Sequence, residues 1–135
     1  MKLTENFTLE EFTNSDTAKR YKIKNIPNND QIDNIKWLCQ MILEPLRTHF
    51  NKPIKISSGY RSPELNTKIG GAQNSHHTAW ELFAAADFII PVVDLYVIHK
   101  AIIDLNLPFE QNIKEPSWLH VSSRRPKQQS FEIKK

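Results

Sequence analysis

The most regular pattern in the sequence is a row of apolar residues between positions 32 and 46. Its members recur every three or four positions and are Ile32, Ile35, Cys39, Ile42 and Leu46. This spacing predicts one apolar stripe on a helix of roughly 20 residues. Pro45 lies inside that helix and has no amide hydrogen, so we expect a kink or a new segment there.

Local signals predict the structure on the N-terminal side of that helix. Thr8 and Glu11 have the spacing of a capping box, which predicts a short helix beginning at Thr8. Residues 15–29 are polar and contain Pro27, so we expect a loop there.

Two more helices are expected further along the chain. Residues 63–69 predict a short helix that starts at a proline and is stopped by Gly70-Gly71. Residues 92–105 predict an amphipathic helix. Its expected apolar stripe consists of Val93, Val97, Ala101, Ile102 and Leu105.

The strand signals lie between and after these helices. Residues 53–58 alternate with period two, and residues 84–90 form an apolar run that ends at a proline. Residues 109–114 and 118–122 predict a hairpin, and Phe131–Ile133 predicts an edge strand. This order of elements predicts an α+β fold with N-terminal helices and a small antiparallel sheet.

Size and composition fit one globular domain over residues 1–135. The chain has 135 residues, of which 39% are hydrophobic and 24% charged, enough to bury about two thirds of its unfolded surface. Cys39 is the single cysteine, so no internal disulfide can form. The first residues lack the apolar region of a signal peptide, and Asp87 and Pro91 interrupt the longest apolar stretch. We therefore expect a soluble chain, synthesised in the cytoplasm, with no membrane span.

The net charge of +3 and the pI of 9.0 come in large part from residues 124–135. This basic tail contains Arg124, Arg125, Lys127, Lys134 and Lys135. It can contact an anionic polymer or be a solvated, charged terminus. We expect the second, and no nucleic-acid partner.

The candidate chemistry centres on Asp87, a carboxylate inside an apolar run. Burying a lone carboxylate is costly unless a cation pairs with it, and that cation can be a metal ion or an arginine. Two imidazoles and one carboxylate form a three-ligand zinc site with an open position for water. In the alternative interpretation Asp87 pairs with Arg61 and His120 is a core histidine; the residue types alone leave both open.

Five motifs occur in an order known from one family. They are Ser58-Gly59-Tyr60-Arg61-Ser62-Pro63-Glu64-Leu65-Asn66, Ile69-Gly70-Gly71-Ala72, Ser75-His76-His77, Ala85-Ala86-Asp87-Phe88 and Trp118-Leu119-His120-Val121-Ser122. The sequence resembles, over residues 5–122, the M15 peptidases of the D-Ala-D-Ala carboxypeptidase type. These are zinc enzymes that act on peptidoglycan peptides. The resemblance implies the small zinc fold shared by hedgehog proteins and D-Ala-D-Ala peptidases, in a chain that we expect to be monomeric.

The resemblance also implies a role for each matching residue. The zinc ligands would be His77, Asp87 and His120, and the zinc-activated water would attack the substrate peptide bond. Glu115 would be the general base, while the substrate would be held by Arg61, Trp118 and Ser75. With no signal peptide, such an enzyme would reach the cell wall by another route of release.

The chain departs from the family motif Ser-x-His-x-x-Gly-x-Ala-Ala-Asp in one segment. Three extra residues separate His77 from Asp87, and Trp80 stands in place of the glycine. If residues 79–86 form a helix, Glu81 becomes a rival ligand; if they form a loop, a strand still brings Asp87 to the metal. We favour the loop. A catalytically impaired member that binds cell-wall peptide or a protein is the alternative function.

The general base is the second departure. In the vancomycin-resistance dipeptidase branch the glutamate lies three residues before the final histidine, where this chain has Ser117. Glu115 is five residues before His120, beside a proline, and a solvated turn carboxylate is its alternative role.

Overall fold

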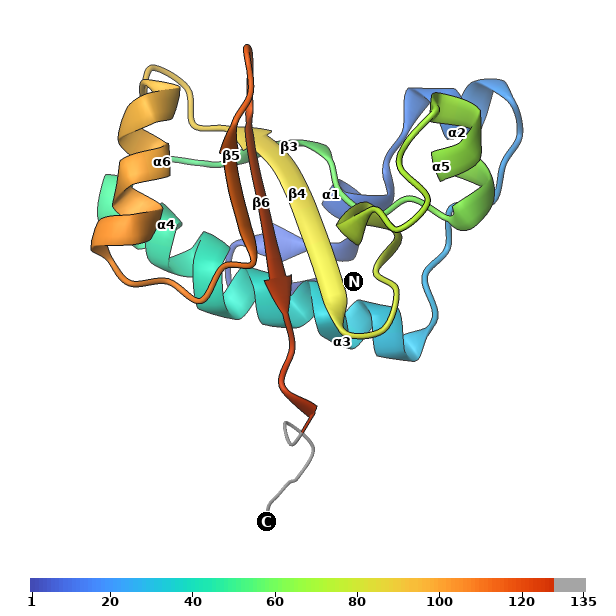
Figure 1. The fold of residues 1–135 in the computed structure, drawn as a ribbon, viewed down its shortest axis with the longest axis horizontal. Helices are drawn as coiled ribbons and strands as arrows, with labels where there is room; N and C mark the ends of the chain where they lie inside the picture. The colour runs from blue at the N-terminus through green and yellow to red at the C-terminus, as the bar shows by residue number, and fades with distance from the viewer. Residues whose placement is uncertain (128–135) are drawn as a thin grey trace.

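A four-stranded antiparallel sheet forms the centre of the molecule. In the computed structural model, which describes residues 1–127, its strands are β3 (Lys55–Ser58), β4 (Phe83–Ile89), β5 (Gln111–Lys114) and β6 (Leu119–Arg124). They are arranged in the order β3-β4-β6-β5, so β6, the last strand within residues 1–127, pairs with both β4 and β5 (Figure 1). Together with the helices around it, this sheet confirms the predicted α+β class.

The two faces of the sheet differ in chemistry because side chains alternate along each strand. One face contributes Ala86, Phe88, Leu119 and Val121 to the hydrophobic core. The residues between them in the sequence point to the opposite face. That second face carries the polar groups described below.

A row of three consecutive helical segments covers the apolar face of the sheet. It consists of α3 (Asn29–Leu38), the π-helical segment η1 (Cys39–Leu43) and α4 (Glu44–Phe50). The wider π turn comes immediately before Pro45 and shifts the carbonyls that the proline ring would meet in a regular α-helix. The chain thus passes Pro45 in one continuous helical row (Figure 1).

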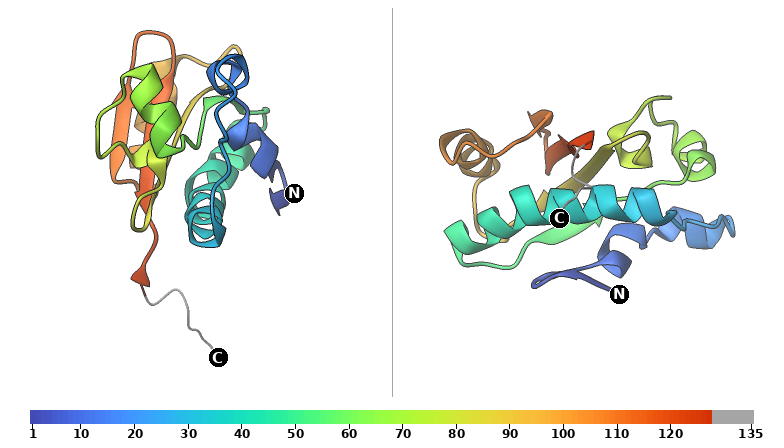
Figure 2. Two further views of the ribbon diagram at one scale, coloured as in Figure 1. Left: turned by 90° about the vertical axis from the view of Figure 1, so that its right-hand side faces the viewer. Right: turned by 90° about the horizontal axis from the view of Figure 1, so that it is seen from below.

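The N-terminal residues pack on the other side of this helical row (Figure 2). They form β1 (Lys2–Thr4), β2 (Phe7–Thr8) and α1 (Leu9–Thr13), and both hydrogen bonds of the predicted capping box between Thr8 and Glu11 are present. The expected loop over residues 15–29 is partly wrong. It contains α2 (Asp16–Arg20), which begins there because the Ser15 hydroxyl accepts from the Ala18 amide.

The remaining helices flank the sheet (Figure 1). Helix α5 (Pro63–Ile69) ends at Gly70, whose φ of 83° is left-handed, as predicted from the paired glycines. Helix α6 (Leu95–Asp104) begins three residues later than predicted, because Asp94 caps it. Its buried residues are Ile98, Ala101 and Ile102, whereas Val97 and Leu105 of the predicted stripe are exposed.

The predicted hairpin is β5–β6, whereas the predicted edge strand Phe131–Ile133 lies outside the described residues. Of the basic tail, the structure describes residues 124–127. None of the helices in residues 1–127 has both the length and the apolar character needed to cross a bilayer.

Candidate metal centre

Two histidines and one aspartate converge on the polar face of the sheet. Asp87 of β4 and His120 of β6 are direct partners in the strand register, so their side chains leave the same face side by side. His77 comes from the short 3-10 helix η2 (His76–Thr78), which packs against β4. The candidate ligand atoms of these three residues all lie within 4.8 Å of one another.

Hydrogen bonds on the far side of each ring fix which nitrogen faces the aspartate. Nδ1 of His77 lies 2.7 Å from the carbonyl oxygen of Gly59, which can only accept, so Nδ1 carries the proton. Nε2 of His120 lies 2.8 Å from Oε1 of Gln111, and that oxygen also accepts from the Ser122 hydroxyl at 3.1 Å. The nitrogens left for a ligand are therefore Nε2 of His77 and Nδ1 of His120.

Both of those nitrogens point at the same carboxylate oxygen. Oδ1 of Asp87 is 3.1 Å from Nε2 of His77 and 2.8 Å from Nδ1 of His120. In neutral imidazoles these nitrogens carry lone pairs, which repel a carboxylate oxygen. A cation between them removes that repulsion. A typical donor set for zinc consists of two imidazoles and one carboxylate, with each imidazole donating its other N–H to an oxygen.

The electrostatics of Asp87 agree with a site that needs positive charge. Burial opposes ionisation of the Asp87 carboxyl, but His120 and His77, when their facing nitrogens are protonated, outweigh it and hold its pKa well below the usual range. Oδ2 of Asp87 lies 3.9 Å from Nη2 of Arg61. The pairing of Asp87 with Arg61, which the sequence left open as the alternative, is therefore also present. It uses Oδ2, the carboxylate oxygen that does not face the imidazoles.

The three extra residues between His77 and Asp87 form a loop, so the helical alternative is wrong. Ala79 and Glu81 both have positive φ angles, 54° and 49°, and β4 begins soon afterwards at Phe83. Glu81 is exposed and does not belong to the cluster of candidate ligands within the described residues. The loop absorbs the insertion, and the strand still brings Asp87 to the two histidines.

The comparison with known protein families gives one result. The sequence model of Peptidase M15 matches residues 5–122. The chain belongs to the Peptidase M15 family. A search among curated proteins finds no match. The family is one of metallopeptidases, typically zinc-dependent, and the site formed by His77, Asp87 and His120 has donor atoms of the right kind for such an ion.

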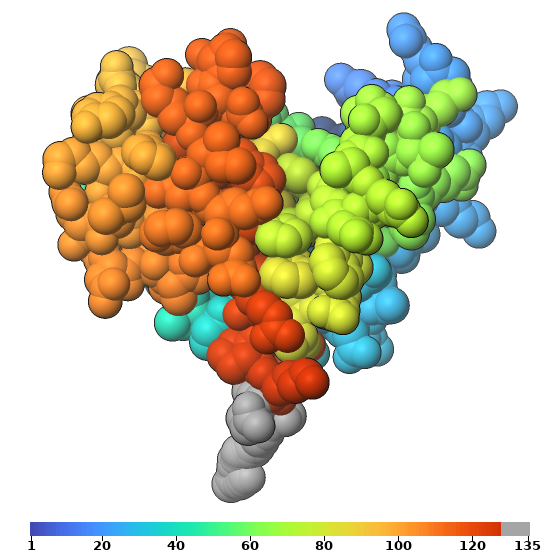
Figure 3. Space-filling model, in the orientation of Figure 1, coloured from blue at the N-terminus to red at the C-terminus, as the bar shows by residue number. Residues whose placement is uncertain are grey.

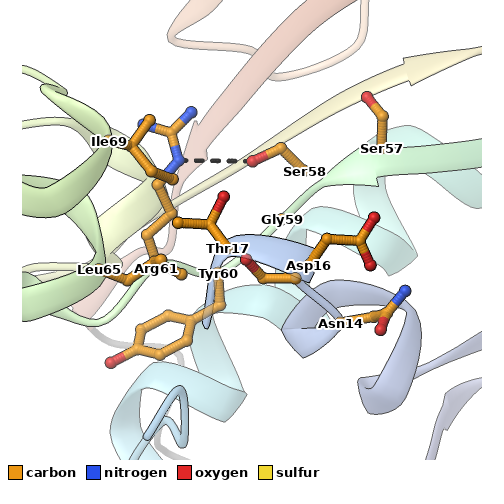
Figure 4. Close-up of a pocket in the computed structure, with 11 residues that line it drawn as sticks. Asn14, Asp16, Thr17, Ser57, Ser58, Gly59, Tyr60, Arg61, Leu65 and Ile69 are labelled. Carbon is orange, nitrogen blue, oxygen red and sulfur yellow. Dashed lines mark hydrogen bonds between the residues drawn. The ribbon is translucent and has the colours of Figure 1, made fainter. Parts of the chain in front are cut away.

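In this M15 peptidase Arg61 lies at the edge of the metal site, beside a pocket of about 370 Å³ (Figure 4). Its guanidinium is held by the Ser58 hydroxyl at 3.4 Å and by the Asn66 side-chain oxygen at 3.1 Å. The pocket is also lined by polar residues such as Asp16 and Ser57. The space-filling view shows the surface hollowed between the β5–β6 hairpin and α5 (Figure 3).

The other predicted site residues lie at different distances from the metal ligands. Glu115 and Trp118 are half-buried in the β5–β6 turn, where the Glu115 amide donates to the Trp118 carbonyl at 2.9 Å. Glu115 is not part of the cluster of candidate ligands within the described residues. Ser75 caps η2, and its hydroxyl accepts from the His77 amide at 3.2 Å, so its visible contact positions a ligand.

Sequence reasoning missed the residues that support His120. Besides Gln111, these are Ser122 and His76, whose Nδ1 lies 2.8 Å from the Ser122 hydroxyl. The His76 ring stacks on Phe83 at 4.0 Å, and burial, with the charge of His120, lowers the pKa of His76. The available signal was the alternation of the hairpin strands, which places Gln111 opposite Ser122 and on the face of His120.

Proposed function

We propose that this M15 peptidase is a zinc enzyme that hydrolyses peptide bonds in peptidoglycan stem peptides, as a D-Ala-D-Ala carboxypeptidase or a related endopeptidase. The observation that carries the proposal is the meeting of two imidazole nitrogens at one oxygen of Asp87. His77, Asp87 and His120 would hold the ion. Zinc, when bound, supplies a Lewis acid that activates water and polarises the scissile carbonyl.

The remaining site residues have the chemistry that peptide hydrolysis requires. Glu115 accepts the proton of the attacking water and returns it to the leaving amine. Arg61 binds a carbonyl or carboxylate of the substrate through its planar guanidinium. Trp118 forms a wall of the cleft, and Ser75 orders the loop that carries His77. We further propose that the chain is a single domain, acts as a monomer, and works at the cell wall after release.

The metal content of the purified protein tests the ligand set directly. We expect about one zinc ion per chain, lost in His77→Ala, Asp87→Ala and His120→Ala. Glu81→Ala is the matched control, because Glu81 is an exposed carboxylate in the same loop. Loss of zinc in Glu81→Ala, or wild-type protein that stays metal-free after zinc is added back, would overturn this site. The second result would favour the impaired, peptide-binding alternative.

Turnover tests the substrate class. A synthetic stem pentapeptide ending in D-Ala-D-Ala and purified cross-linked peptidoglycan are incubated with the enzyme, with and without EDTA. Release of free D-Ala identifies the carboxypeptidase, and cleavage of the cross-links identifies the endopeptidase. Hydrolysis that persists after complete removal of the metal contradicts the proposal. The Arg61→Lys variant should retain its zinc but have a higher KM, because the lysine ammonium cannot make the bidentate hydrogen bonds of a guanidinium.

A further inference from the structure

A second pocket, of about 460 Å³, shares no lining residue with the pocket of Figure 4. It is formed by α5, the glycine-containing turn after it and Trp80. All of the residues that line it are uncharged, and the exposed side chains that offer hydrogen bonds include Gln73 and Asn74. The pocket therefore combines neutral amide groups with one large aromatic ring.

Trp80 is fixed in place as a wall of this pocket. Its indole Nε1 donates to the carbonyl of Asn74 at 3.0 Å, and its ring contacts Phe83 at a centroid distance of 4.9 Å. The side chain is only half-buried. A hydrogen-bonded, partly exposed indole presents apolar surface with little conformational entropy left to lose on binding.

The backbone around Trp80 is strained and strongly supported. The residues on either side, Ala79 and Glu81, both have left-handed φ angles, which side chains disfavour. The buried Asn34 donates to the carbonyls of both, at 3.2 and 2.9 Å, and its own oxygen accepts from Arg125 at 2.8 Å. Strain that the surrounding structure maintains in this way is typical of functional loops.

We propose that this pocket binds an N-acetylated sugar ring of a glycan chain. The C–H face of a pyranose packs on an indole ring, and its hydroxyl and acetamido groups match amides, which both donate and accept. The absence of charge from the pocket lining disfavours a peptide terminus or a phosphate. A volume of about 460 Å³ is in the range of small-molecule sites.

The pocket is connected to the metal site through Asn66 and Arg61. Asn66 lines the pocket and accepts from Nη1 of Arg61, whose Nη2 lies 3.9 Å from Asp87. In this proposal the sugar lies in this pocket while the stem peptide attached to it extends past Arg61 to the metal site. The inference deepens the proposed function and rests on it for the identity of the glycan.

The test is binding of a β-1,4-linked tetramer of N-acetylglucosamine, followed by NMR titration of the full chain. We expect binding by the wild type, and affinity weakened about tenfold or more in Trp80→Ala, because the aromatic contact is lost. Gln73→Ala should weaken it less. Tyr96→Ala is the matched control, since Tyr96 is an exposed aromatic residue on α6, and it should bind as the wild type does.

Three results would overturn the inference: no binding by the wild type, equal binding by Trp80→Ala, or equal loss in Tyr96→Ala. If Trp80→Ala fails to fold, Gln73→Ala replaces it as the test, because the Gln73 side chain is exposed and can be removed without unfolding the chain. Weaker tetramer binding by Gln73→Ala then supports the inference, and unchanged binding overturns it. The titration is repeated with His77→Ala. If His77→Ala still binds the tetramer, the sugar-binding pocket is supported even if the zinc assay fails. If the wild type hydrolyses its substrate but does not bind the tetramer, the sugar-binding inference is wrong and the proposed function is unaffected.

Discussion

Asp87 and His120 are paired across β4 and β6, and Oδ1 of the aspartate lies 2.8 Å from Nδ1 of the histidine. Their separation is therefore set by the backbone pairing of β4 with β6. His77 joins them from outside the sheet, on a short helix whose His77 carbonyl accepts from the Arg61 amide at 2.9 Å. The site is accordingly most sensitive to changes that reorient a ring.

Gln111→Leu should weaken zinc binding by roughly 10- to 100-fold, because the Nε2 proton of His120 loses its acceptor and the ring can turn. The zinc dissociation constant, measured by competition with a chelator, checks this. Lys114→Ala is the control on the same strand, because its side chain is exposed. Unchanged affinity in Gln111→Leu would mean that the sheet alone orients His120.

Gly59→Ala should displace the carbonyl that holds His77. An added Cβ would lie 2.7 Å from Cα and 2.8 Å from the carbonyl oxygen of Phe12, and neither backbone atom can move freely. The carbonyl of residue 59 should then shift away from Nδ1 of His77, lowering both stability and zinc affinity. Gly70→Asn, at a left-handed position with open space around it, should change neither by much. Thermal unfolding with and without zinc separates the two effects.

Asn34→Leu should unfold or rearrange the loop that carries Trp80. The change removes two donors to the loop carbonyls and leaves Arg125 without its acceptor, which costs about 1–3 kcal/mol. We expect a lower free energy of unfolding in urea and a shift in tryptophan fluorescence. Lys36→Ala, an exposed change on the same helix, serves for comparison. A stable variant with an unaltered spectrum would show that the loop holds its shape without Asn34.

Acid should weaken the contact between Glu44 in the helical row and Asn6 in the turn between β1 and β2. Burial opposes ionisation of Glu44, but hydrogen bonds, including those from Asn6, outweigh it and lower the pKa of its carboxyl. A pKa that is lowered on folding stabilises the protein above the ordinary glutamate range, and the stabilisation is lost as the pH falls through the folded-state pKa. Glu44→Gln should therefore be less stable than the wild type at neutral pH and equally stable in strong acid, as urea titrations at several pH values can test.

Local signals in the sequence predicted local structure well. The capping box at Thr8 and the glycines after α5 act within one turn, so the residues that decide the outcome are adjacent in the chain. The five-residue helix α2 was missed because it is too short to show an apolar stripe. The start of α6 was misplaced because apolar Val92 and Val93 extended the pattern, although Val92 is 93% exposed.

The sequence predicted the candidate metal ligands, because residue types and motifs identify them, but it did not predict the groups that orient them. The motif order pointed to His77, Asp87 and His120, and the structure brings these three together. The partners that orient the rings, Gln111 and the Gly59 carbonyl, depend on strand register and on backbone groups that carry no sequence signal. The course of the inserted loop depends on Asn34, more than forty positions away in the chain.

The position of β6 in the sheet has a consequence for how the enzyme is made. It is the last strand described in the chain, yet it lies between β4 and β5 and provides His120. A ribosome-bound chain that has not yet emerged past this strand has an incomplete sheet and only two of the three candidate ligands. Binding of one ion by all three candidate ligands thus requires that β6 has been made and has paired with β4.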